Sequence, residues 1–134
     1  MADQKPVVRH FIACEQVELF PDTRQYTLHK VIYVIRALPG APFPRIQPAI
    51  DLFALLSDGQ GTHHFWIDIV TWEATEERSI FTSREAILDL GQDPLKVLGW
   101  PIHLTDIPFL QPGLYEVHLA CDGEIIAREP IMLR

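Results

Sequence analysis

Apolar and polar residues alternate along several stretches of this chain, which is the period of a half-buried β-strand. In the clearest case Tyr115, Val117, Leu119 and Cys121 are apolar, whereas the residues between them are mostly polar. Comparable runs rich in β-branched and aromatic residues predict strands over 7–20, 26–37, 49–56, 62–72, 100–109, 114–121 and 124–133. We therefore expect an all-β protein of seven to eight strands, in which residues 7–134 form one antiparallel β-sandwich domain and residues 1–6 are disordered.

Turn residues separate the predicted strands. Asp122 and Gly123 supply the two positive-φ positions of a type I′ turn, so the last two strands are expected to form a hairpin. The glycine-containing loop 57–61 is expected to connect strands 49–56 and 62–72 as another hairpin. Four prolines fall within residues 39–48, which predicts a stiff loop or a sheet edge because proline has no N–H to donate.

Two further segments carry local signals. Pro101 and Pro108 indicate that strand 100–109 lies at the edge of a sheet. Within 73–98, Ser83 is a suitable N-cap and Gly91 a suitable stop, so we predict one short helix in the 73–98 segment.

The C-terminal third carries a family resemblance. Pro112-Gly113-Leu114-Tyr115 leads into a strand, Asp122-Gly123-Glu124 turns it, and a final strand ends at Leu133. This arrangement resembles the closing segment of a family of small uncharacterised bacterial proteins, and Phe11-Ile12-Ala13-Cys14-Glu15 resembles the opening strand of that family. The resemblance implies an immunoglobulin-like β-sandwich in which the Tyr115 hydroxyl bonds back to the main chain and fixes a corner. The family has no assigned activity, so no functional residue is carried over; a jelly-roll or C2-like sandwich is the alternative fold.

Composition narrows the possible partners. The 134 residues carry a formal charge of −7, which argues against nucleic acid and against anionic membranes as partners. The N-terminal residues lack the apolar run of a signal peptide, and no apolar stretch approaches the roughly 18 residues that span a bilayer, so we expect a cytoplasmic protein. In that compartment Cys14 and Cys121 are expected to be buried free thiols rather than a disulfide.

The chain shows no motif for catalysis, metal or cofactor binding. Of the six histidines only His63 and His64 are adjacent, and neighbours on a strand point to opposite faces, so no zinc site and no cofactor is expected. Gly59-Gln60-Gly61 is followed by neither a lysine nor a helix, which leaves no phosphate loop. We expect a protein that is not an enzyme; the enzymatic alternative would need His63, His103 and the loop 73–85 to converge.

The most informative strand is 62–72, because both of its faces are apolar. One face holds Phe65, Ile67 and Ile69, and the other holds His64, Trp66, Asp68, Val70 and Trp72. The second face could be covered by segment 73–98, could be a subunit interface, or could be a platform on which a sugar or peptide stacks. We expect a non-enzymatic interaction or structural module that forms a homodimer through His64, Trp66, Asp68 and Trp72. The alternative is a carbohydrate- or peptide-binding domain that uses the same aromatic residues.

Overall fold

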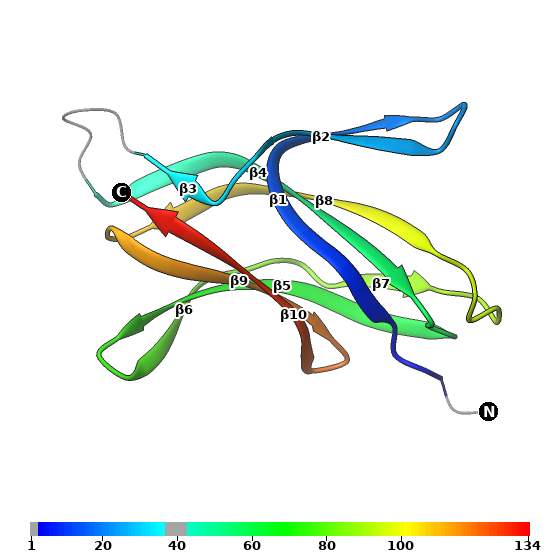
Figure 1. Cartoon of the computed structure of the whole chain (residues 1–134). Helices are drawn as coiled ribbons and strands as arrows, with labels where there is room; N and C mark the ends of the chain where they lie inside the picture. The colour runs from blue at the N-terminus through cyan, green and yellow to red at the C-terminus, as the bar shows by residue number, and fades with distance from the viewer. Residues whose placement is uncertain (1–2, 37–42) are drawn as a thin grey trace.

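The computed structural model describes residues 3–36 and 43–134, which form ten strands in two sheets. No helix occurs within those residues, so none of them forms a helix able to cross a membrane. The two sheets lie in two layers (Figure 1), and the protein is an all-β, sandwich-like structure, as the strand periodicity predicted.

The first sheet has four antiparallel strands in the spatial order β2-β1-β4-β8. They are β1 (Val7–Phe20), β2 (Gln25–Val31), β4 (Arg45–Ser57) and β8 (Leu98–Phe109). Strand β8 lies at the edge of this sheet, as its prolines predicted. One edge of β8 pairs with β4, and the other edge pairs with no described strand.

The second sheet has the order β3-β10-β9-β5-β6, and β7 pairs with β5 beside β6. Its strands are β3 (Val34–Ile35), β5 (Thr62–Glu73), β6 (Glu76–Thr82), β7 (Ala86–Asp89), β9 (Gly113–Cys121) and β10 (Glu124–Leu133). The β3–β10 pair is parallel, so the expectation of a purely antiparallel sandwich was wrong at this edge.

The core lies between the two sheets and takes alternate residues from each strand. Its largest fully buried side chains include Leu52 of β4, Phe65 of β5 and Leu119 of β9. Because successive side chains on a strand point to opposite faces, this inward set leaves His64, Trp66, Asp68 and Trp72 on the outer face of the second sheet.

The C-terminal turn predicted from its residues and the tyrosine corner implied by the family resemblance are both confirmed. Asp122 and Gly123 have φ values of 51° and 89°, as a type I′ turn requires, and Cys121 pairs with Glu124 across the turn. The Tyr115 side chain is fully buried, and its hydroxyl donates to the Gln111 carbonyl at 2.6 Å while it accepts the Gln111 N–H at 3.3 Å. This tyrosine corner fixes the chain where it enters β9.

The predicted helix in segment 73–98 was wrong. The segment forms β6, which pairs with residues 68–73 of β5, and β7, which pairs with residues 62–65 of the same strand. Ser83 does not cap a helix; its N–H donates to the Ile67 carbonyl and its hydroxyl accepts the Ile67 N–H, both at 2.8 Å. An open strand edge offers more hydrogen bonds than one helical turn can form, and isolated short helices are marginal in water.

Two other local expectations were wrong because the chain changes sheet. Loop 57–61 does not close a hairpin: β4 pairs with β1 and β8, whereas β5 pairs with β9, β6 and β7. The predicted strand 26–37 is divided into β2 and β3, which lie in different sheets. Residue 37 and the prolines at 39 and 42 lie outside the described residues, whereas Pro48 lies inside β4.

The residues before β1 make specific contacts. Gln4 accepts the Gln60 N–H at 2.9 Å, Lys5 forms an ion pair with Glu124 at 2.7 Å, and Pro6 is buried. Residues 3–6 therefore lie across the loop before β5 and the β9–β10 turn.

Candidate functional site

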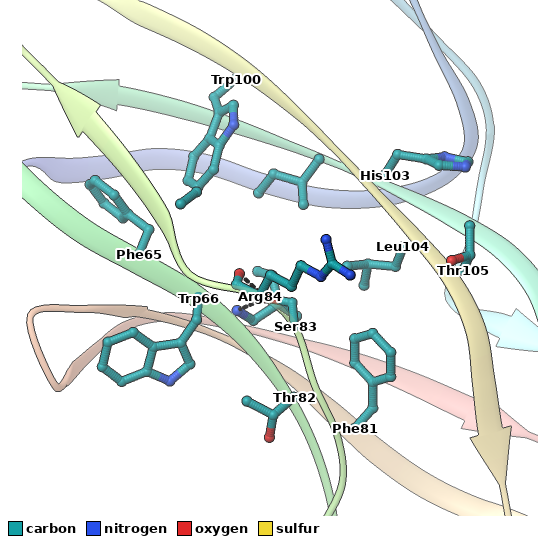
Figure 2. A pocket seen from close by; sticks show the side chains of 13 residues that line it. Phe65, Trp66, Phe81, Thr82, Ser83, Arg84, Trp100, His103, Leu104 and Thr105 are labelled. Atoms are coloured by element: carbon teal, nitrogen blue, oxygen red, sulfur yellow. Dashed lines mark hydrogen bonds between the residues drawn. The ribbon is translucent and has the colours of Figure 1, made fainter.

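A cleft of about 460 Å³ opens on the side of the sandwich where the edges of the two sheets face each other. One wall is formed by β8 and the other by β5, the end of β6 and the residues up to the start of β7 (Figure 2). Its lining side chains are largely aromatic or aliphatic: Phe65, Phe81, Trp100, Ile102 and Leu104. We refer to this feature as the lateral cleft.

Two stretches of main chain border the lateral cleft. Residues 102–105 lie on the unpaired edge of β8, and residues 81–84 lie where β6 ends. Ser83 holds the second stretch against β5 through its two bonds to Ile67, after which the chain steps away and returns as β7 at Ala86. The break between β6 and β7 therefore keeps the cleft open.

Aromatic rings form the floor of the lateral cleft. Phe65 is fully buried and meets Trp100 edge to face, with ring centroids 5.2 Å apart. Phe81 projects from β6, on the same wall as Phe65 and opposite Trp100, and the Arg84 side chain lies between Phe81 and the Phe65–Trp100 pair (Figure 2). Within the described residues no carboxylate forms an ion pair with Arg84, so its guanidinium is available to a ligand. The cleft can take an apolar group beside an anionic one.

His103 lies at the rim of the cleft and is already paired. Its Nδ1 contacts the Asp51 carboxylate, whose other oxygen accepts the Val17 N–H at 2.9 Å. His103 therefore has an acidic partner, whereas Arg84, the other basic side chain that lines the cleft, has none among the described residues.

The four residues predicted as an interface lie together on the outer face of the second sheet. Trp72 is 39% exposed, Trp66 and Asp68 are half-buried, and His64 is exposed and pairs with Glu85. The idea that segment 73–98 covers this face was wrong, because β6 and β7 lie beside β5 in the same sheet.

The centre of this outer face is covered by its own side chains. His118, opposite Asp68, is only 3% exposed, and its Nε2 lies 2.8 Å from a Glu116 carboxylate oxygen. Asp68 accepts hydrogen bonds from Ser79 and Thr82. The face is therefore a hydrogen-bonded polar network with Trp66 and Trp72 beside it, rather than a continuous apolar patch.

A third group of polar side chains lies at the end of the sandwich nearest loop 57–61. His63 is 2% exposed, its Nδ1 lies 2.6 Å from Asp122 Oδ2, and its Nε2 lies 2.7 Å from the Gln60 carbonyl. Burial lowers the pKa of His63, but the bonds to Asp122 and Gln60 outweigh it and raise the pKa overall. The hydrogen bond from the His64 N–H is the main reason that the pKa of Asp122 lies below its usual value, and the bond from the His63 side chain is the second.

Both cysteines are free and buried, and they lie in different sheets. Burial, with Asp122 as the next cause, raises the pKa of the Cys121 thiol to about 11. Burial likewise raises the pKa of Cys14. Neither thiol is set up as a nucleophile, because the thiolate is the reactive form.

The sequence did not identify the lateral cleft. Trp100 stands in the predicted strand 100–109, where it is expected to be a core residue, and Phe81 and Arg84 stand in segment 73–98, for which a short helix was predicted. A usable signal was present in Ser83-Arg84-Glu85, a polar interruption between two apolar strand-like runs.

Comparisons with known proteins support the fold alone. No model of a known protein family matches the chain, and no curated protein matches it. Among solved structures it is similar to the Pseudomonas fluorescens alkylpurine DNA glycosylase AlkC bound to DNA with an abasic site analog, at 15% identity and a TM-score of 0.57. That match covers 99% of this chain and 31% of the glycosylase, so this chain spans less than a third of its length. A beta-D-glucoside glucohydrolase from Trichoderma reesei matches at 8% identity and a TM-score of 0.49, over 98% of this chain and 19% of that chain.

Proposed function

We propose that this protein is a non-enzymatic binding module that holds a short extended peptide with a carboxylate in the lateral cleft. The observation that carries this proposal is the pair of main-chain stretches that border an aromatic cleft beside Arg84, which forms no ion pair with the described residues. A peptide-binding domain was the alternative hypothesis from the sequence, but that hypothesis placed the peptide on the outer face of strand 62–72. Here we place it at the side of the sandwich.

The unpaired edge of β8 supports an extended peptide as the ligand. Alternate residues within 102–105 point their main-chain N–H and C=O groups away from β4, and an extended peptide could add there as a further strand. Alternate side chains of such a peptide point the same way, so one set would face Phe65, Phe81 and Trp100. Aromatic side chains of this kind are common anchors in binding sites.

The charge of the lining supports a carboxylate on that peptide. Arg84 offers a planar set of donors that matches a carboxylate, and its head group lies within the cleft (Figure 2). The chain as a whole carries a formal charge of −7, so a strongly anionic ligand would be repelled everywhere except near such a local cation. A single carboxylate, at the peptide terminus or on a side chain, fits both facts.

A peptide selection tests the proposal. Linear peptides would be selected from a phage-displayed library against the wild-type chain, and the best one would be synthesised with a free C-terminal carboxylate and as the amide. Calorimetry would measure both forms against wild type, Arg84→Gln and the control Arg78→Gln, whose arginine pairs with Glu73 outside the cleft. Loss of a charge-assisted hydrogen bond predicts that Arg84→Gln weakens binding about tenfold or more, and that Arg78→Gln changes it little.

Two results would contradict the peptide function. One is a selected peptide that binds wild type and Arg84→Gln equally. The other is a tryptophan fluorescence response to a panel of glycans with no peptide selected, which would favour the carbohydrate alternative.

Self-association is a second candidate, carried by the exposure of Trp72 beside Trp66 on the outer face. Aromatic residues are enriched at the cores of interfaces. A homodimer through His64, Trp66, Asp68 and Trp72 would convert to a monomer when both tryptophans are replaced by serine. Sedimentation equilibrium of a wild-type chain that is already monomeric would exclude it.

The tyrosine corner and the segment Pro112-Gly113-Leu114-Tyr115 also support an immunoglobulin-like version of the fold and membership of the small bacterial family that the sequence resembles. The two buried thiols without a disulfide are in keeping with a cytoplasmic module.

A further inference from the structure

Three side chains of different chemistry converge at the end of the sandwich nearest loop 57–61. His63 begins β5, whereas Cys121 and Asp122 stand at the end of β9 and in the turn that follows it. One ligand atom of each, an imidazole nitrogen, the thiol Sγ and a carboxylate oxygen, lies within 4.8 Å of the other two. Nitrogen, sulfur and oxygen are the three donor types that Zn²⁺ takes in proteins.

The spacing of these atoms is close to that of a tetrahedral zinc site, in which ligand atoms lie about 3.3–3.6 Å apart for bonds of about 2.0–2.3 Å. Asp122 Oδ2 lies 3.8 Å from Cys121 Sγ and 2.6 Å from His63 Nδ1. Binding an ion would therefore require the imidazole and carboxylate to separate by less than about 1 Å.

Two of the three groups are held by outer partners of the kind that metal ligands use. The Gln60 carbonyl can only accept, so His63 Nε2 carries the hydrogen of that bond and Nδ1 is the atom turned toward Asp122. The second oxygen of Asp122 accepts the His64 N–H at 2.9 Å. A ring N–H bonded to a carbonyl and a carboxylate held by a second bond orient first-sphere ligands in metal sites.

We propose that His63, Cys121 and Asp122 form a Zn²⁺ site with three protein ligands and one coordination position that faces solvent. The mixed donor set suits the borderline-soft Zn²⁺ better than Mg²⁺ or Ca²⁺, which prefer oxygen. His63 and Cys121 are buried, whereas the Asp122 side chain is 33% exposed, so an ion enters past Asp122. Within the described residues no fourth histidine, cysteine or acidic side chain joins the group, which leaves the fourth position to water.

Binding has a defined proton balance. Cys121 must lose its thiol proton, and His63 must present Nδ1 without a proton, because a lone pair binds the metal. The bound ion would link the start of β5 to the β9–β10 turn, which the His63–Asp122 bond links without metal. The site is separate from the lateral cleft, so it stands independently of the proposed peptide binding.

Cobalt provides the direct test, because a thiolate bound to Co²⁺ gives a near-ultraviolet charge-transfer band and a tetrahedral site gives intense visible bands. Tag-free chain, stripped with a chelator, would be titrated with Co²⁺ and then with Zn²⁺ against a chromophoric competitor. We expect a one-to-one complex with a thiolate band that Zn²⁺ abolishes.

Two ligand variants and two control variants test the assignment. Cys121→Ser should abolish the thiolate band and weaken Zn²⁺ binding by more than the roughly 10–100-fold that loss of an outer partner causes. Asp122→Asn should weaken binding but keep the band, and it should fold because Asn-Gly is a favoured type I′ pair. The matched controls are Cys14→Ser, the other buried thiol, and His64→Ala, the adjacent exposed histidine; both should behave as wild type.

The proposal is overturned if wild type gives no thiolate band, or if the band persists in Cys121→Ser or disappears in Cys14→Ser. It is also overturned if a circular dichroism spectrum shows Asp122→Asn folded while its Zn²⁺ affinity equals that of wild type. In that case the three side chains form only a structural hydrogen-bonded group.

Discussion

Replacing Tyr115 with phenylalanine isolates the energy of the tyrosine corner. The ring is fully buried and packs edge to face on Phe109 with centroids 4.9 Å apart, and phenylalanine retains that packing. Only the hydroxyl is lost, together with its bonds to the Gln111 carbonyl and N–H at 2.6 and 3.3 Å. A net hydrogen bond contributes about 0.5–1.5 kcal/mol, and an unpaired buried group costs about 1–3 kcal/mol. Because Gln111 is at the surface and water can replace part of the lost pairing, we expect a loss of about 1–2 kcal/mol.

Urea denaturation followed by tryptophan fluorescence measures this loss as a lower midpoint with an unchanged slope. The matched control is Tyr33→Phe, which removes a hydroxyl from a tyrosine that is 70% exposed and should change stability by less than about 0.5 kcal/mol. If the two variants lose the same stability, the corner does not hold the entry to β9 and its hydrogen bonds are energetically neutral.

Three further changes test the core, the turn and a half-buried acid. Leu119→Ala should remove about 2–5 kcal/mol in the same assay, because Leu119 is fully buried between the sheets; a loss below about 1 kcal/mol would contradict the described core. Gly123→Ala should cost about 1–2 kcal/mol from its φ of 89° alone, since nothing lies within 4 Å of an added Cβ; an unchanged midpoint would exclude the type I′ turn. Burial raises the pKa of Glu129, so its ionised form opposes folding. The wild type should therefore lose stability relative to Glu129→Gln as pH rises through the carboxyl range, whereas a stability difference that stays constant across that range would contradict this.

Local turn chemistry explains what the sequence could predict. Asp122-Gly123 acts on the residues next to it, so the C-terminal hairpin followed directly from residue types. The corner made by Tyr115 is also local, but it was implied by the family resemblance. Strand existence followed from alternation in the same way, as in β1, β8, β9 and β10.

Strand pairing could not be predicted, because alternation fixes which face of a strand is buried and leaves its neighbour open. The glycines of loop 57–61 are compatible with a hairpin and with a connection between sheets. In the structure this loop connects β4 of the first sheet to β5 of the second. The segment after Glu73 contains a serine suited to cap a helix. It forms β6 and β7 instead, because pairing with the free edge of β5 satisfies more of its main-chain hydrogen bonds. His63 and Asp122 are 59 residues apart and meet only because β5 pairs with β9, so no spacing rule could join them.

The edge of β8 also limits what can occupy the lateral cleft. Proteins protect exposed strand edges with prolines and local changes of backbone direction. Strand β8 has one such feature before residues 102–105 and one after them. Pro101 offers no N–H, and Asp106 has a φ of 55°, which turns the backbone out of the extended conformation. The stretch able to pair therefore lies within 102–105, which together with Trp100 is the part of β8 that lines the cleft. Four residues are too few for the long edge-to-edge contact of two sheets, but they suit a short peptide, so a selected peptide cut to about four residues around its carboxylate should keep most of its affinity.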